Sequence, residues 1–321
     1  MKVRGRSFRS WARVLRAFVM ALTLVHASDA HARMEPVVFE VAATEFVIDA
    51  ADGMGGFADA AREVIEADWH RVMAASGAPD GETVFVMLER EFDDYFEREG
   101  LASRPPEWAA GLAIPSRRVI ILAPGNSTWQ ATLSHEMSHI AVAIAAGDEQ
   151  VPAWFQEGFA VAVAEQWSIE RASTMIQAGV TGAFLDFDEL ANGFPSQNGG
   201  VGLAYAQSFH FVRFARNRYG DDVFARVMRR MRVDGLSFSR AFAEEAGTLL
   251  SFAMDEWESS ARTRFVFAPV ATGGGAAWGL ASVLAVWVWR RRKKRQAARL
   301  QAMSNEEAAL YVPDPDDEKF R

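Results

Sequence analysis

The chain has 321 residues, half of them apolar, and contains no cysteine, which excludes disulfides and thiolate metal sites. This length fits one globular domain with appendages. The net charge of −8 conceals an uneven distribution, because residues 34–289 carry 18 basic and 35 acidic side chains. A surface this acidic argues against a nucleic-acid partner and against lying on anionic lipid.

The first 32 residues have the composition of a secretory signal peptide. Six basic residues accompany a short apolar core at residues 17–25, and Ala30-His31-Ala32 fits the small-x-small cleavage pattern. The alternative is an uncleaved N-terminal anchor, but this core is too short to span about 30 Å of hydrocarbon. We therefore predict that residues 1–32 are a signal peptide and that residues 33–264 form an extracytoplasmic domain.

The first half of this domain alternates short apolar runs with one helix. Residues 35–48 are typical of one or two strands, and apolar residues recur at helical spacing within residues 57–75. Residues 83–88 and 118–122 are typical of two further strands. The remaining domain is mainly helical. These patterns predict an α+β fold, with a small mixed sheet followed by a mainly helical half.

His135, Glu136 and His139 form the pattern H-E-x-x-H. Residues four apart share one face of a helix, so the two imidazoles can bind one Zn²⁺ while Glu136 faces the open side of the metal. Asn126-Ser127 can cap this helix. Its expected buried residues recur at helical spacing: Leu133, Met137, Ile140, Ala141 and Ile144. The alternative is two surface histidines on an amphipathic helix.

The segment at residues 151–160 offers a third ligand. Pro152 suits the first turn of a second helix, and 17 residues separate Glu157 from His139. The alternative is that Glu157 is an exposed helix carboxylate. H-E-x-x-H followed by Trp154-Phe155-Gln156-Glu157-Gly158 resembles the gluzincin metallopeptidases of the peptidase MA clan, which include thermolysin-like and aminopeptidase N-like enzymes.

The resemblance implies that His135, His139 and Glu157 are zinc ligands and that Glu136 is the general base. In that clan a Tyr or His downstream of the third ligand steadies the oxyanion, so Tyr205 is the preferred candidate and His210 the second. The alternative is an ordinary core tyrosine and a surface histidine. The resemblance also implies an edge strand that borders the cleft and pairs with substrate.

By this analogy, Val119–Ala123 would be the edge strand, with an internal strand as the equal alternative.

The chain departs from the clan in two places. Val161 stands where an acidic residue four positions after Glu157 is usual, so the outer-shell acid is sought at Glu165, Asp186 or Asp188. The Gly-x-Met-Glu-Asn signature is also missing, because Gly111–Pro115 contains no acid. Without an anchor for a free amine, an endopeptidase is favoured.

The helical half and the C-terminal region complete the prediction. Helices are expected at residues 152–167, 185–194, 203–219, 222–232, 237–246 and 249–262. Residues 270–289 carry no charge and are long enough to span a bilayer as a helix. The basic run at residues 290–295 places that end in the cytoplasm by the positive-inside rule. The alternative is a buried core helix. Residues 290–321 are polar and are predicted to be a cytoplasmic tail.

Together these patterns predict a membrane-anchored, Zn²⁺-dependent metallopeptidase that acts on peptide or protein substrates outside the cytoplasm. They predict no nucleic-acid partner. Two alternatives come from other functional classes. The first is a catalytically silent peptide-binding or scaffold module of the cell envelope. The second is a membrane-tethered interaction protein in which the H-E-x-x-H pattern is accidental.

Overall fold

The computed structural model describes residues 32–100, 111–125, 128–147, 149–164, 166, 169–195, 200–271 and 281–293. The chain falls into two compact units. The first runs up to Ala172 and resumes at Leu185–Asp255, and the second comprises Ser173–Phe184 and the residues from Glu256 onward. All but the last residue of the predicted signal peptide, and residues 294–321 of the predicted tail, lie outside the described residues.

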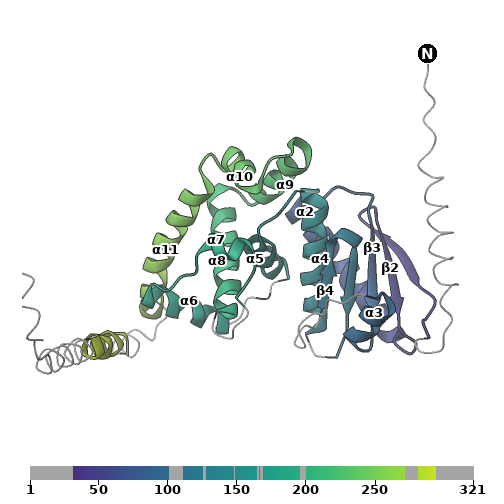
Figure 1. Ribbon diagram of the computed structural model, residues 1–321, viewed down its shortest axis with the longest axis horizontal. Helices are drawn as coiled ribbons and strands as arrows, with labels where there is room; N and C mark the ends of the chain where they lie inside the picture. The colour runs from purple at the N-terminus through teal and green to yellow at the C-terminus, as the bar shows by residue number, and fades with distance from the viewer. Residues whose placement is uncertain are drawn as a thin grey trace, which may run out of the picture. The chain divides into compact units, whose positions relative to one another are not determined.

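One mixed sheet of five strands belongs to the first unit (Figure 1). The strand order is β1-β2-β3-β5-β4, in which β2, β3 and β5 are parallel and the two outer strands pair antiparallel. This arrangement confirms the predicted small mixed sheet. The strands are β1 (Val37–Val41), β2 (Thr44–Ala50), β3 (Thr83–Leu88), β4 (Gly111–Ile114) and β5 (Val119–Leu122).

The prediction that Val119–Ala123 is the edge strand is wrong, because β5 lies between β3 and β4. The outer strand is β4, which pairs antiparallel with β5. A single turn of 3-10 helix, η1 (Pro115–Arg117), joins the two strands, and Arg118 completes the reversal with a left-handed φ of 57°. The edge strand beside the H-E-x-x-H helix is therefore β4.

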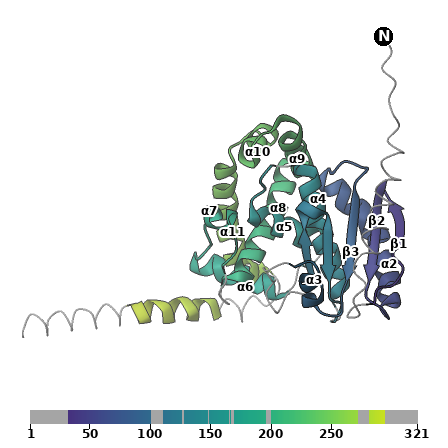
Figure 2. The same ribbon diagram turned by 45° about the vertical axis from the view of Figure 1, so that its right-hand side comes forward.

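Helices cover both faces of the sheet. On one face lie α2 (Gly55–Ser76) and α4 (Trp129–Ala146), and Figure 2 shows α2 alongside the strands. Phe46 packs edge-on against Trp69 there, with ring centroids 5.1 Å apart. The other face is covered by α3 (Phe92–Arg98). The α4 residues predicted to be buried are buried: Leu133, Met137, Ile140, Ala141 and Ile144.

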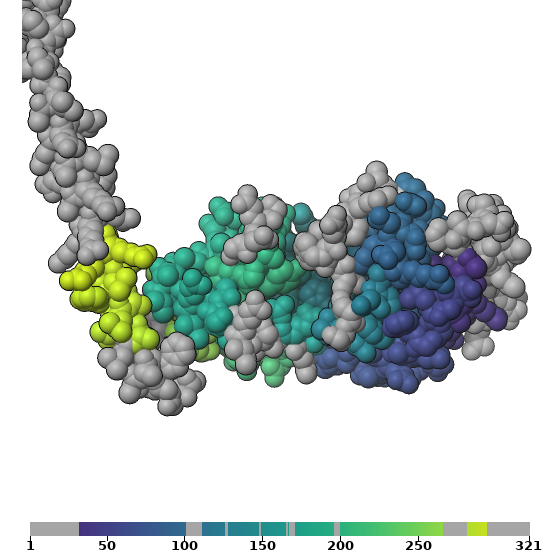
Figure 3. Space-filling model, turned by 90° about the horizontal axis from the view of Figure 1, so that it is seen from below, coloured from purple at the N-terminus to yellow at the C-terminus, as the bar shows by residue number. Residues whose placement is uncertain are grey.

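The second half of the first unit is helical, as predicted. Its aromatic core joins α5 to the later helices, since Trp154 packs edge-on against both Phe211 and Phe238. In the space-filling view, the purple and blue atoms of the N-terminal segments lie together at one side (Figure 3). The helices are α5 (Ala153–Val163), α7 (Phe187–Ala191), α8 (Val201–Tyr219), α9 (Val223–Asp234) and α10 (Phe238–Ala246).

Two helices continue into the second unit. They are α6 (Ile169–Thr181), which the sequence analysis did not predict, and α11 (Leu250–Ala271), which extends beyond the predicted 249–262. Within the second unit, the buried Trp257 packs edge-on against Phe184 with centroids 5.3 Å apart. The predicted membrane span at residues 270–289 is only partly described, since residues 272–280 lie outside. In the part of the chain that is described, none of the helices combines the length and apolarity needed to cross a bilayer.

A buried ion-pair network follows β3. The Glu89 carboxylate is 1% exposed, and its two oxygens accept from Arg33 Nη1 and Arg98 Nη2, each at 2.7 Å. Arg33 Nε also pairs with Asp49 at 2.9 Å. The network ties the first described residues to the end of a central strand and to α3.

We expect Glu89→Gln to lower the free energy of unfolding by about 3 kcal/mol, because it removes the charge that two guanidinium groups share and leaves Arg33 only its pair with Asp49. Urea denaturation measures the change. The matched control is Glu66→Gln, which removes a 45%-exposed carboxylate paired with Arg62 on α2. That exposed pair should contribute less than about 1 kcal/mol. Equal losses in the two variants would contradict the assigned role of Glu89.

Candidate metal centre

Two consecutive helices supply the predicted ligands. His135 and His139 are one turn apart on α4, which ends at Gly147 with a positive φ of 70°. The chain then re-enters a helix after Pro152, and Glu157 lies in the second turn of α5. The predicted cap at Asn126-Ser127 lies outside the described residues, and α4 begins after Thr128 without a side-chain cap.

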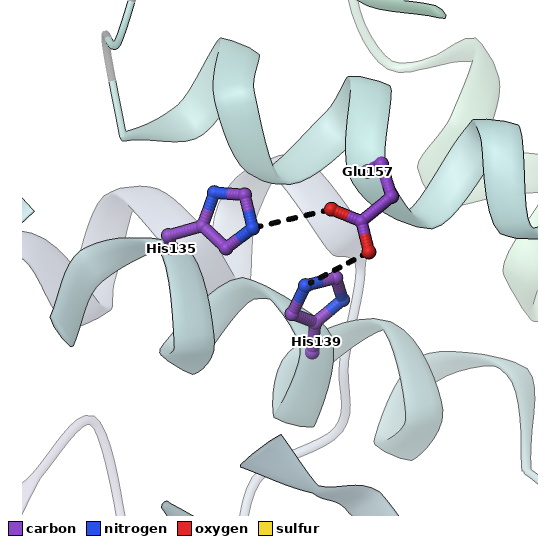
Figure 4. A group of neighbouring side chains, drawn as sticks. All are labelled: His135, His139 and Glu157. Carbon is purple, nitrogen blue, oxygen red and sulfur yellow. Dashed lines mark ion pairs between the residues drawn. The ribbon is translucent and has the colours of Figure 1, made fainter. Parts of the chain in front are cut away.

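The three predicted ligand side chains point toward one another (Figure 4). His135 Nε2 lies 3.3 Å from Glu157 Oε2, and His139 Nε2 lies 3.8 Å from Glu157 Oε1. One ligand atom from each residue lies within 4.8 Å of the others. The structure therefore brings together all three residues that the sequence pattern selected.

This donor set fits zinc. Two imidazole nitrogens and one carboxylate oxygen form a common catalytic zinc site, and bonds of about 2.0–2.1 Å in tetrahedral geometry separate ligand atoms by about 3.3 Å. The buried Oε2 atom of Glu157 has no hydrogen-bond partner among the described residues. Because a buried carboxylate oxygen without a partner is unfavourable, a cation held by the three side chains would satisfy it.

Electrostatics keep the ligands in their metal-binding forms. Burial alone would raise the pKa of Glu157, but the two imidazoles and a hydrogen bond with Tyr205 outweigh it and hold the pKa below its ordinary value. Burial lowers the pKa of His139, and the nearby Glu157 carboxylate only partly offsets this effect. Both groups are therefore biased toward an ionised carboxylate and a neutral imidazole, which are the forms that bind zinc.

Glu136 lies beside the ligands and under the edge strand. It is 8% exposed, and burial raises its pKa to about 7, with the Glu157 charge adding to the shift. The imidazole of His139 and a hydrogen bond from the Ala113 backbone N–H act in the opposite direction. A carboxyl with a pKa near neutrality can accept and return a proton at physiological pH.

Gly111 is a residue of this region that sequence reasoning missed. A Cβ atom there would lie 2.6 Å from Thr132 Cγ2 and 3.0 Å from Glu136 Cγ. The missing side chain thus allows β4 to approach the general base closely. Glycine within a strand often marks such a close approach, and this is the signal that could have identified it.

Tyr205 projects from α8 toward the third ligand. Its hydroxyl hydrogen-bonds with the Glu157 carboxylate, and burial together with the Glu157 charge raises its pKa, so the phenol stays protonated. Its ring packs edge-on against Phe194, with centroids 4.9 Å apart. His210, the second candidate, lies further along the same helix. Tyr205 is thus placed beside the third ligand.

Two of the three candidates for the outer-shell acid, Asp186 and Asp188, lie at the start of α7. Asp186 accepts a hydrogen bond from the Asp188 backbone N–H and so caps α7, and both carboxylates are exposed. Glu165 lies outside the described residues. The buried Nδ1 of His135 has no hydrogen-bond partner in the part of the chain that the structure describes. Asp186 thus serves as the cap of α7, and the source of an outer-shell acid stays a prediction.

We expect the purified full chain to bind one equivalent of zinc. His139→Ala and Glu157→Ala should each weaken binding by more than about 100-fold, because losing a ligand costs more than losing an outer-shell partner. Competition with a chromogenic chelator measures the dissociation constants. His70→Ala is the control, since it removes an exposed histidine on α2. Unchanged affinity in the ligand variants would remove the metal assignment.

The chain was compared with curated proteins, solved structures and protein families. No curated protein matches the chain. Among solved structures, similarity is found to a two-domain M1 zinc metallopeptidase mutant bound to L-tryptophan, at 13% identity and TM-score 0.38, covering 71% of this chain and 51% of that one. The M1 zinc metallopeptidase from Deinococcus radiodurans gives 13% identity and TM-score 0.34, covering 74% and 51%.

The chain thus spans about half the length of these solved structures. The sequence family supplies the stronger likeness. The Peptidase MA superfamily matches residues 98–263, which include both metal-site helices and Tyr205. This match and the His-His-Glu cluster together support a zinc metallopeptidase. The chain belongs to the peptidase MA superfamily.

Proposed function

We propose that the chain is a membrane-anchored zinc endopeptidase whose catalytic domain lies outside the cytoplasm. The observation that carries the proposal is the convergence of His135, His139 and Glu157, with the Glu136 carboxyl buried beside them. Bound zinc would supply a Lewis acid that polarises the scissile carbonyl and lowers the pKa of the attacking water.

The chain's own residues account for the proton transfers. Glu136 takes a proton from the attacking water and delivers it to the leaving amine, for which a pKa near 7 is suited. The protonated Tyr205 hydroxyl, next to Glu157, donates to the substrate carbonyl oxygen as that oxygen gains negative charge. Among the described strands none pairs with β4 on its outer side, and an extended substrate would pair there through backbone hydrogen bonds.

The composition of the edge strand favours internal cleavage. Aminopeptidases need a carboxylate that holds the free amino terminus, whereas β4 consists of Gly111, Leu112, Ala113 and Ile114. Nothing in this strand would bind an ammonium group. The strand therefore suits a peptide that extends on both sides of the metal and is cleaved internally, rather than a peptide bound by its amino terminus.

We expect Glu136→Gln to lower kcat on an unfolded polypeptide by about 10²- to 10⁴-fold, because the general base is lost. The variant should still bind zinc. Mass spectrometry of the products from an N-terminally acetylated peptide follows the reaction. A silent peptide-binding module would bind this peptide equally in both forms and show no cleavage by the parent chain, and that result would overturn the proposal.

Tyr205→Phe should lower kcat by about 10²- to 10³-fold at saturating zinc, because an oxyanion donor is removed. Tyr219→Phe is the matched control, since it deletes a hydroxyl at the other end of the same helix α8. Steady-state kinetics separate the two effects. A small change in kcat for Tyr205→Phe would assign the tyrosine to ligand support alone.

The membrane anchor rests on the sequence pattern of residues 270–295. The uncharged run followed by six basic residues would hold the chain in a bilayer with residues 33–264 outside the cytoplasm. We expect the full chain to resist extraction by alkaline carbonate and a chain ending at residue 269 to be released. N-terminal sequencing should begin at Arg33. Recovery of the full chain in the soluble fraction would exclude the anchor.

A further inference from the structure

The zinc ligands and the proposed oxyanion donor come from different helices. His135, His139 and Glu157 lie on α4 and α5, whereas Tyr205 lies on α8. Tyr205 therefore reaches the ligand cluster only if α8 packs against α5 at the right distance. What sets that distance decides whether the tyrosine can act.

Helices α5 and α8 approach each other closely at Gly158, the residue after Glu157. A Cβ atom built there would lie 2.5 Å from both the carbonyl carbon and oxygen of Ser208, and 2.9 Å from the Phe209 nitrogen. All three are backbone atoms, which cannot rotate out of the way as a side-chain tip can. Any side chain at this position would have to move α8 as a whole.

The contact at Gly158 is one helical turn from Tyr205. Ser208 is three residues after Tyr205, so both lie on the same face of α8. On the far side of this contact, Trp154 of α5 packs against Phe211 of α8, with ring centroids 5.2 Å apart. These two contacts show that α5 and α8 run antiparallel. Tyr205 lies one turn beyond the Gly158 contact and interacts with the Glu157 carboxylate.

A second anchor fixes α8 from another side. The buried Gln207 side chain accepts a hydrogen bond from the Leu185 backbone N–H at 2.9 Å and donates one to the Leu185 carbonyl at 2.7 Å. Because both bonds go to the backbone of one residue, α8 cannot rotate about its axis without breaking them. Gln207 therefore restricts the rotation of α8, and Gly158 allows its close approach to α5.

We propose that Gly158 is a positioning residue for Tyr205. Its missing side chain lets α8 sit against α5, so that the tyrosine hydroxyl reaches the Glu157 carboxylate. Only the expected effect on kcat rests on the proposed function, in which Tyr205 is the oxyanion donor. The placement of Tyr205 by Gly158 is a claim about the folded chain and can be tested without turnover.

The first test is a double-mutant cycle with Gly158→Ala and Tyr205→Phe in the full chain. At saturating zinc, Gly158→Ala should lower kcat by about the 10²-fold expected for loss of the donor, and should do so only while Tyr205 is present. In the Tyr205→Phe background, Gly158→Ala should change kcat by less than about threefold, because the hydroxyl that it displaces is already absent. The proposal would be overturned if the double variant lost kcat by the product of the two single losses. It would also be overturned if Gly158→Ala alone left kcat unchanged.

The second test reads the position of Tyr205 directly. The chain has four tyrosines, so incorporated 3-fluorotyrosine gives a simple ¹⁹F NMR spectrum, in which Tyr205→Phe identifies the relevant signal. Glu157→Gln should shift this signal in the parent chain and leave it unshifted in the Gly158→Ala background. An equal shift in both backgrounds would overturn the proposal. Zinc titration of the parent chain tests the metal site separately. If the parent chain did not bind zinc, that result would contradict the proposed function but not the placement of Tyr205 by Gly158.

The matched control is Gly202→Ala, because it places a methyl group on the same helix α8 at a site with no atom within 4 Å of it. This variant should keep the parent kcat and the parent ¹⁹F response. If Gly158→Ala does not fold, Gln207→Met replaces it, since that change releases the other anchor of α8. Its loss of kcat should again vanish in the Tyr205→Phe background, and a loss that persists there would overturn the proposal.

Discussion

The structure depends on burying an ionised carboxylate between two imidazoles. Removing a charge from water is unfavourable unless other charges or hydrogen bonds replace the water. At Glu157 the imidazoles of His135 and His139 and the Tyr205 hydroxyl outweigh burial, so that the group stays ionised. Three helices must therefore meet at one point, and much of the helical half of the first unit serves to bring α5 and α8 there.

Features that depend on local spacing could be predicted from the sequence. His135 and His139 share a helix face because they are four residues apart, and the buried residues of α4 follow the same period. Glu157 could be selected because the loop between two consecutive helices is short. The parallel strands β3 and β5 were recognisable from their apolar runs alone.

Features that depend on contacts between distant segments could not be predicted. Strand β4 has four residues and leads directly into a turn at Pro115, so no periodic pattern marks it as the edge strand. Helix α6 is a different case, because apolar residues do recur along it at helical spacing and the sequence analysis did not use them. The source of an outer-shell acid could not be chosen from the sequence either, because sequence position does not reveal which side of a helix end Asp186 and Asp188 face.

Two glycines show how backbone approach, rather than side-chain chemistry, places the two proposed catalytic groups. At Gly111 the nearest obstacles are side-chain atoms of Thr132 and Glu136, so β4 is held against the general base itself. At Gly158 the obstacles are backbone atoms of α8, so the contact fixes a whole helix and, through it, Tyr205. The base is thus positioned from the sheet and the oxyanion donor from the helical half. The metal ligands lie between them, so the site needs both halves of the first unit to be complete.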